Sequence, residues 1–516
     1  MSALAIRQPL RRLSQQDLFA QIAAALGIAA VAAALAWFVG NHWSLRGFAI
    51  ALTAAASIWF LTTRRTLLAL GILAVYLGAL DGYLKLASGS HALTFVRDVL
   101  VFALAIGVLV RAQARGERLS LPPLSRWVLA FVVLVLVQLF NPQAGSFAHS
   151  LAGARQHLEF VPLFFLTFAF VRTKHALRGF LIILLLVAAA NGIAGFIQIN
   201  ETPAQFAAWG PGYSERVLGT GDFIAAGRTF YNADTGKGQT RPFGLGSDSG
   251  SGGAIALYGI AGALALAALF TRIRYLLFAV VMAIGATTAI VTSQARGAIV
   301  ASVVILLAYA LMVVTSRGRV ASVIGVVLAG LVVLFAAHQV VGSVGGSSSL
   351  RYEGLNTANV VQTAEKARGR SIAHIPNNLA SYPLGAGLGV AGPSASAPGA
   401  SPLTLSGRVD AETEVSFMTL ETGIPGMLVL IGFVITLFAT GVQRCRREPD
   451  RETRLLLAAL VAPLAGALLL FMASAVTAAV PGAPYVWAVG GVISYWLIAR
   501  PAAERRCAQL AAAGSS

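Results

Sequence analysis

Residues 179–199 read GFLIILLLVAAANGIAGFIQI, a run without charged side chains that follows the basic segment RTKHALR at 172–178. About 20 apolar residues in a helix cross the hydrocarbon core of a bilayer, so this run is typical of a membrane-spanning helix. Further apolar runs occur along the whole chain. Together they make fourteen, at about 18–39, 47–62, 67–80, 93–110, 127–140, 158–171, 179–199, 251–270, 275–292, 297–315, 320–341, 414–441, 455–478 and 485–499.

The composition of the chain agrees with this pattern. Of its 516 residues, 57% are hydrophobic and only 11% are charged, whereas soluble proteins carry about 25% charged residues. A soluble globular protein and intrinsic disorder are therefore excluded. We predict an all-α polytopic membrane protein with about 12–14 transmembrane helices, forming a single integral membrane domain over residues 1–516. Some runs are short enough to be re-entrant or interfacial; these are 47–62, 67–80, 127–140 and 158–171.

The net charge of +18 is distributed unevenly between the connecting segments. If the N-terminus is inside, the inner segments total 82 residues and hold 24 of the 38 Lys and Arg, and the outer segments total 169 residues and hold 13. Only this polarity satisfies the positive-inside rule. Both termini are then cytoplasmic. The two long loops, 200–250 and 342–413, lie on the outer side, and the second is expected to contain a helix over 357–381 that Pro376 ends or kinks.

The outer position of the long loops restricts the chemistry. Nucleoside triphosphates are not available there, and the sequence has no P-loop pattern, which argues against an ATP-driven enzyme and against a nucleotide-sugar transferase. The basic inner loops carry no interleaved aromatic residues, so no nucleic-acid partner is predicted. No His, Cys, Asp or Glu spacing indicates a metal site, and no cofactor is expected.

Charged residues gather near the predicted outer ends of the helices. Charges in spanning segments are costly and indicate functional sites by default. A transporter would place such groups near the midplane and usually shows an internal repeat, which is not found. Groups at the interface favour an enzyme acting on a lipid-linked substrate, and guanidinium groups match the oxygens of a phosphate or diphosphate. The residues are Arg97, Asp98, Arg155, Glu159, Arg241, Asp248, Arg296, Glu412, Glu414 and Glu421.

Several short motifs follow one another in the second half of the chain. They are RPFGLG at 241–246, TSQARGAI at 292–299, YPLGAGLG at 382–389, VDAETE at 409–414 and ETGIPG at 421–426. In this order and topology they resemble the O-antigen ligase and polysaccharide polymerase family of bacterial inner-membrane glycosyltransferases. The resemblance covers roughly residues 150–440.

The resemblance implies a reaction at the periplasmic face of the inner membrane, in which a glycan moves from undecaprenyl diphosphate to an acceptor hydroxyl. Ligases of this family carry a His-Asn pair shortly before the Glu-x-Gly-Ile-Pro-Gly helix, and this chain lacks it. Glu412 stands where the histidine would fall, and an acidic group there is closer to the polymerases. We therefore expect polymerisation of repeat units, with membrane lipid, a flippase and a chain-length regulator as partners.

The residues suggest roles compatible with this reaction. Arg241, Arg296 and Arg155 are expected to bind the diphosphate, and Glu414, with Glu412 second, to take the proton of the acceptor hydroxyl without a metal. His374 and Arg370 are auxiliary candidates. Structural alternatives are an ion pair of Arg155 with Glu159 four residues later, helix capping by Glu412 and Glu414, and a plain amphipathic position for His374. Glu421 is interpreted as mainly structural, next to the Gly423–Gly426 kink.

Other functions also fit the pattern. An O-antigen ligase is the alternative within the family. A transporter or flippase for lipid-linked glycans, and a non-catalytic membrane subunit of an export complex, are the alternatives outside it.

Overall fold

The computed structural model describes most of the chain. The described residues are 45–90, 93–117, 120–218, 229–231, 238–270, 272–313, 330, 335, 368–369, 371–392, 411, 413–474, 476–477 and 482–513. The predicted helix at 18–39 lies outside these residues, as do Glu412, Arg370 and all of the predicted helix at 320–341 except residues 330 and 335.

The regular secondary structure of the described part is helical apart from one short hairpin, in which β1 (Thr229–Tyr231) pairs antiparallel with β2 (Gly238–Thr240). The helices in its first half are α2 (Leu45–Thr62), α3 (Thr66–Val75), the π-helical turn η1 (Tyr76–Leu80), α4 (Asp81–Ser88), α5 (Thr94–Ala114), α6 (Ser125–Gln138), the 3₁₀ turn η3 (Pro142–Ala144), α7 (Phe147–Leu158), α8 (Val161–Phe170), α9 (Lys174–Ile199), α10 (Pro203–Ala207) and α11 (Pro211–Leu218). The helices in its second half are α12 (Ser251–Leu269), α13 (Ile273–Thr292), α14 (Arg296–Val313), α18 (Ile375–Ser381), α20 (Glu414–Cys445), α21 (Arg451–Leu470), α22 (Gly482–Ile493), the π-helical turn η5 (Ser494–Ala499) and α23 (Arg500–Ala513).

Eight helices of the described part are long and apolar enough to cross a membrane. They are Thr66–Ser88, Lys174–Ile199, Ser251–Leu269, Ile273–Thr292, Arg296–Val313, Glu414–Cys445, Arg451–Leu470 and Gly482–Arg505. The outer surface of α13 shows why a bilayer is needed, because Ile273, Leu277, Val281 and Ile284 form one helical stripe and are each more than half exposed. The chain is a multi-pass, all-α membrane protein, as the composition predicts.

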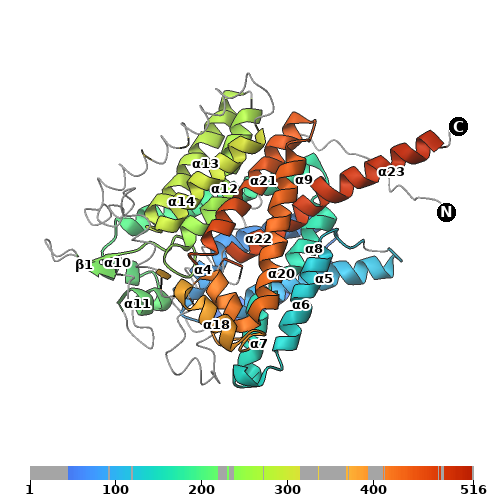
Figure 1. The fold of residues 1–516 in the computed structure, drawn as a ribbon. Helices are drawn as coiled ribbons and strands as arrows, with labels where there is room; N and C mark the ends of the chain where they lie inside the picture. The colour runs from blue at the N-terminus through green and yellow to red at the C-terminus, as the bar shows by residue number, and fades with distance from the viewer. Residues whose placement is uncertain are drawn as a thin grey trace.

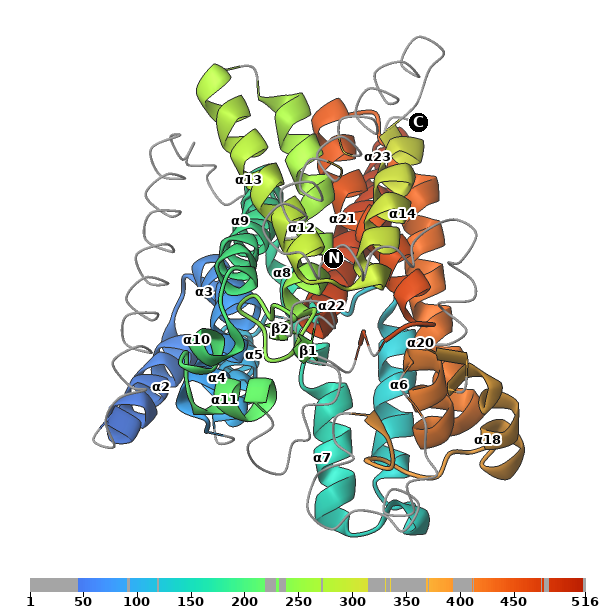
Figure 2. The same ribbon diagram turned by 90° about the vertical axis from the view of Figure 1, so that its left-hand side faces the viewer.

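The centre of the bundle depends on small residues. Helix α9 packs against both α12 and α13 (Figures 1 and 2). A Cβ atom on Gly192 of α9 would collide with the carbonyl oxygen of Gly285 in α13, and one on Gly259 of α12 would collide with Ala188 of α9. Close approach of this kind lets helix backbones associate in lipid, where no hydrophobic force drives them together.

Contacts divide the connecting segments into two sets on opposite ends of the bundle. In one set, Lys174 binds Asp450 at 2.8 Å and Arg178 pairs with Glu452. In the other, the Asn141 side chain, before α7, donates to the Gly385 carbonyl in the loop 383–391 at 3.0 Å. Figure 2 shows α7, α10, α11 and α18 in the lower half, while the turns that join α12 to α13 and α20 to α21 lie at the top. The charge count groups these segments in the same way.

Two predicted elements differ in extent from the structure. The run at 67–80 continues as a helix to Ser88, because η1 widens the helix by a π-turn and α4 extends it through Asp81 and Lys85. Within the helix expected over 357–381, the described part breaks at His374 and restarts as α18 with Pro376 in its first turn, a position that proline favours.

Candidate functional site

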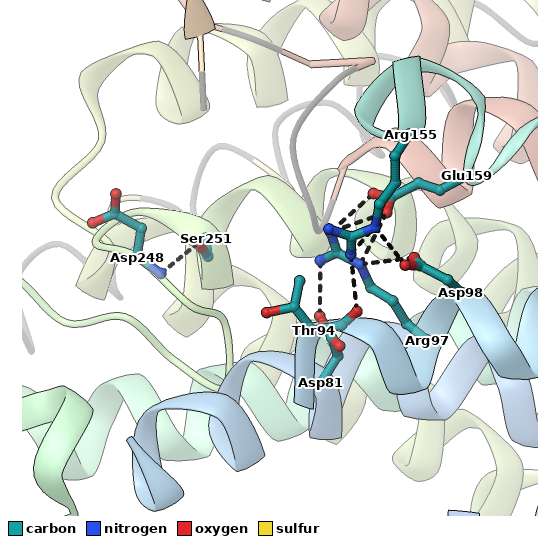
Figure 3. Close-up of polar contacts among 8 residues, drawn as sticks. All are labelled: Asp81, Thr94, Arg97, Asp98, Arg155, Glu159, Asp248 and Ser251. Carbon is teal, nitrogen blue, oxygen red and sulfur yellow. Dashed lines mark hydrogen bonds and ion pairs between the residues drawn. The ribbon is translucent and has the colours of Figure 1, made fainter. Parts of the chain in front are cut away.

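A buried network of charges lies where α4, α5 and the end of α7 meet (Figure 3). The Arg97 guanidinium binds Asp81 at 3.3 Å and Glu159 at 3.0 Å. Arg155 pairs with Asp98, and its second nitrogen lies 3.7 Å from Glu159. Glu159 is 1% exposed and Asp81 3%. Removing one partner of such a buried pair typically costs about 3–5 kcal/mol, since the other charge stays buried and uncompensated.

Arg155 therefore has a defined set of protein partners. Its ion pair with Glu159 four residues later is present, as the structural alternative predicts. Its guanidinium also donates to the carbonyl of Thr94 at 3.1 Å and lies 4.6 Å from the ring centre of Phe95. These contacts fix the relative position of α5 and α7, so the structure ties Arg155 to the protein scaffold.

The turn that carries Arg241 is held by amide side chains of α9. The Gln198 side-chain oxygen accepts from the N–H groups of Phe243 at 2.9 Å and Gly244 at 2.8 Å, and its nitrogen donates to the Gly244 carbonyl at 2.8 Å. The Asn191 oxygen accepts from Leu245 N–H at 2.9 Å. Both amides are buried, so hydrogen bonds fix this turn to α9.

The two turns that carry Arg241 and Arg296 lie against each other. A Cβ atom on Gly250 would lie 3.2 Å from a guanidinium nitrogen of Arg241 and 3.5 Å from the Cβ of Ala295. Arg296 follows directly as the first residue of α14. Gly250 has a φ of 87°, in the left-handed region, so glycine suits both its backbone and this close approach. The arrangement brings two basic turns from separate parts of the chain to one place.

Glu414 occupies a closed position at the start of α20. Its carboxylate accepts hydrogen bonds from the N–H groups of Val476 and Thr477 and from the Thr477 hydroxyl. The residue is 1% exposed. Thr413 caps the same helix end through a reciprocal capping box with Ser416. Both oxygens of Glu414 are thus engaged in joining α20 to the segment after α21.

A second buried carboxylate lies two turns along α20. Glu421 binds the Nε2 of His157 at 2.7 Å, and its other oxygen accepts from Gly389 N–H at 2.7 Å and Ala391 N–H at 3.3 Å. The predicted kink follows at Gly423, whose φ of 65° interrupts the helix. Glu421 therefore joins α7, α20 and the loop 383–391 at one point.

The glycine-rich loop is packed rather than loosely exposed. Gly385, Gly387 and Gly389 have φ values of 94°, 95° and 83°, a conformation that other residues rarely adopt. The alternate residues Ala386 and Leu388 are fully buried. Each of the three glycines packs closely on a neighbouring element: Gly385 on the backbone of Glu421 in α20, Gly387 on Ala144 of η3, and Gly389 on α7, where its carbonyl contacts the His149 ring nitrogen at 2.6 Å.

The remaining candidates from the sequence are His374, Arg370 and Glu412. His374 is exposed and precedes α18. Arg370 and Glu412 lie outside the described ranges. Within those ranges, no group of three or more His, Cys, Asp or Glu side chains could hold a metal ion.

Several site residues were missed by reasoning from sequence. Asn191 and Gln198 interrupt an apolar run seven residues apart, which places them on one helix face, and that spacing was the available signal. His157 and Thr477 carry no comparable signal, since their partners Glu421 and Glu414 lie far along the chain.

Comparison with known proteins does not assign the chain to a family. No family model matches the chain, and no curated protein matches it. The function is therefore inferred from the site.

Proposed function

We propose that this protein is a glycosyltransferase of the bacterial inner membrane that polymerises oligosaccharide repeat units carried on polyprenyl diphosphate. Its long loops face the periplasm and its termini the cytoplasm. The observation that carries the proposal is the contact between the Arg241 turn and the Ala295–Arg296 turn. The Arg241 guanidinium lies beside Ala295, the residue before Arg296. A pair of neighbouring arginines suits a diphosphate, since each guanidinium can donate two parallel hydrogen bonds to its oxygens.

The reaction requires little beyond positioning and charge stabilisation. The acceptor hydroxyl attacks the anomeric carbon of the lipid-linked glycan, the bond to the diphosphate breaks, and the diphosphate leaves with the bonding electrons. Arg241 and Arg296 stabilise the charge that develops on it. A carboxylate removes the proton of the hydroxyl.

The choice of proton acceptor follows from the hydrogen bonds of Glu414. Since both oxygens of Glu414 are engaged with Val476 and Thr477, we assign Glu414 to holding the end of α20. Glu412, two residues earlier, is then the proton acceptor. Arg155 holds α5 and α7 in place and does not bind the diphosphate directly.

Product analysis tests the proposal. Purified protein is given a lipid-linked repeat unit in detergent, and chain growth without another acceptor is expected. Transfer only to lipid A core would indicate a ligase, and transbilayer movement in liposomes without bond change would indicate a transporter. Either result would contradict polymerisation. Variants Arg241→Lys and Arg296→Lys should lose the activity, whereas Arg274→Lys, at the other end of the bundle, should retain it.

A further inference from the structure

A second, smaller hydrophobic core lies beside the Arg241 turn, separate from the core of the bundle. It consists of Leu86, Phe206, Ala207, Tyr213, Val217 and Phe243. Helices α4, α10 and α11 contribute to it and lie together in Figure 2. Phe243 stacks on Tyr213 with ring centres 5.8 Å apart. Because Phe243 is only two residues from Arg241, at most about 7 Å of chain separates the cluster from that arginine.

Two partly exposed aromatic rings cover this core. Tyr83 and Trp209 meet edge to face with centroids 6.3 Å apart, and Trp209 packs on Phe206 at 5.9 Å. The indole N–H of Trp209 donates to a carboxylate oxygen of Glu201 at 3.0 Å. The indole is thus fixed in orientation with an acidic group at its edge.

Two polar atoms here have no hydrogen-bond partner among the described residues. They are the second carboxylate oxygen of Glu201 and the hydroxyl of Tyr213, both buried. Burial raises the pKa of Tyr213, and the neighbouring Tyr83 and Glu201 raise it further, so these groups lie within electrostatic range of one another. An unpartnered buried group costs about 1–3 kcal/mol, and a buried water is the usual partner of such a group.

We propose that Tyr83, Trp209 and Glu201 form a glycan subsite that binds a pyranose of the lipid-linked substrate near its diphosphate. This inference rests on the proposed function. A pyranose offers an apolar face for the Trp209 and Tyr83 rings, and its hydroxyls can reach the buried Glu201 oxygen through a bridging water. The position beside Phe243 places such a sugar next to the Arg241 turn. In the alternative, Trp209 and Tyr83 only anchor the protein at the membrane interface.

Kinetics with matched variants test the subsite. Trp209→Leu removes the ring, and Glu201→Gln removes the charge but keeps an oxygen for the indole N–H. Trp59→Leu is the control, because Trp59 on α2 is 37% exposed and outside this cluster. The probe is the lipid-linked repeat unit extracted from source cells that lack this protein. We expect KM to rise about 10-fold in both subsite variants with kcat within about twofold, and the control to match wild type. Inhibition by polyprenyl diphosphate alone should not change, since the arginines remain.

A binding measurement separates this inference from the proposed function. The protein has seven tryptophans, and soluble repeat-unit oligosaccharide should quench a fraction of their fluorescence in wild type and Trp59→Leu but not in Trp209→Leu. Trp209-dependent quenching without any glycan transfer would support the subsite and reject the transferase. Normal KM and quenching in Trp209→Leu and Glu201→Gln, with polymer still made, would overturn the subsite. Equal losses of thermal stability in Trp209→Leu and Trp59→Leu, with unchanged KM, would indicate membrane anchoring and also overturn it.

Discussion

Replacement of Glu414 by glutamine or alanine separates anchoring from catalysis. In glutamine, the side-chain oxygen can accept from the N–H groups of Val476 and Thr477, and the nitrogen can donate to the Thr477 hydroxyl, so all three hydrogen bonds can persist. Hydrogen bonds to charged groups contribute about 1.5–3 kcal/mol and neutral ones about 0.5–1.5. The loss is about 1 kcal/mol for each bond, and it is partly offset because a buried charge is removed. We expect a net loss of about 1–3 kcal/mol.

Alanine has no such replacement. It leaves two backbone donors and one hydroxyl buried without partners, each costing about 1–3 kcal/mol. The sum, about 3–9 kcal/mol, is comparable with the whole stability of a typical protein. Glu414→Ala should therefore accumulate poorly in membranes or unfold at much lower temperature in detergent, while Glu414→Gln should unfold only a few degrees below wild type.

Polymer formation by the purified variants completes this test. Glu414→Gln should keep a rate within about 10-fold of wild type, because its role is to hold α20. Glu412→Gln should lose about 10²–10⁴-fold, the usual contribution of a general base, without loss of stability. A stable but inactive Glu414→Gln beside an active Glu412→Gln would refute this assignment and exchange the two roles. A Glu414→Ala protein as stable as wild type would refute the hydrogen bonding itself.

Substitution of the two arginines, removal of divalent metal, substitution in the glycine-rich loop and acid should each have a distinct effect. Arg241→Lys and Arg296→Lys should each reduce polymer at least about 10-fold at normal protein levels, since lysine cannot donate two parallel hydrogen bonds; full activity in vitro would reject the diphosphate role. Activity should survive EDTA, and loss that Mg²⁺ or Mn²⁺ restores would instead indicate metal binding by the acidic residues. Gly387→Ala should destabilise the protein by about 2–4 kcal/mol from left-handed strain and a collision with Ala144. Gly116→Ala, also at a positive φ but with no atoms near its Cβ position, should show only the strain; equal shifts in thermal stability would contradict the packing. A hydrogen bond from Lys174 lowers the pKa of Asp450 in the folded protein. The stabilisation that this carboxylate gives the fold is therefore present above its unfolded pKa of about 3.9 and is lost as pH falls through its folded pKa. Acid should lower the unfolding temperature of wild type more than that of Asp450→Asn.

Hydropathy was sufficient to predict the helical architecture. A run such as 179–199 is apolar because α9 lies inside a bilayer or bundle along its whole length, so local composition identifies it. The helix continuing to Ser88 was not predictable in this way, because the stabilisation of Asp81 comes from Arg97 on the next helix. Composition reports burial of a segment but not the partners of a polar group within it.

The same limit applied to the candidate site. The arginines and acidic residues were identified by their predicted depth, yet depth does not show which of them is engaged. Glu414 and Thr477 are 63 positions apart, and His157 and Glu421 are 264 apart. Pairings over such separations depend on how helices pack, and one sequence does not specify that packing. Arg155 shows both cases, since Glu159 lies within one helical turn whereas its closer partner Asp98 is 57 positions away.

Polymerisation forms each new glycosidic bond at the expense of one lipid diphosphate linkage. Purified protein should be incubated with the lipid-linked repeat unit alone, and polymer length and released polyprenyl diphosphate should be counted together. A chain of n repeat units assembled on one lipid must release n − 1 polyprenyl diphosphates, and we expect this ratio for wild type and no release in Arg241→Ala. Polyprenyl diphosphate released without chain growth, or lipid-linked repeat units left intact by an active, folded preparation, would contradict it.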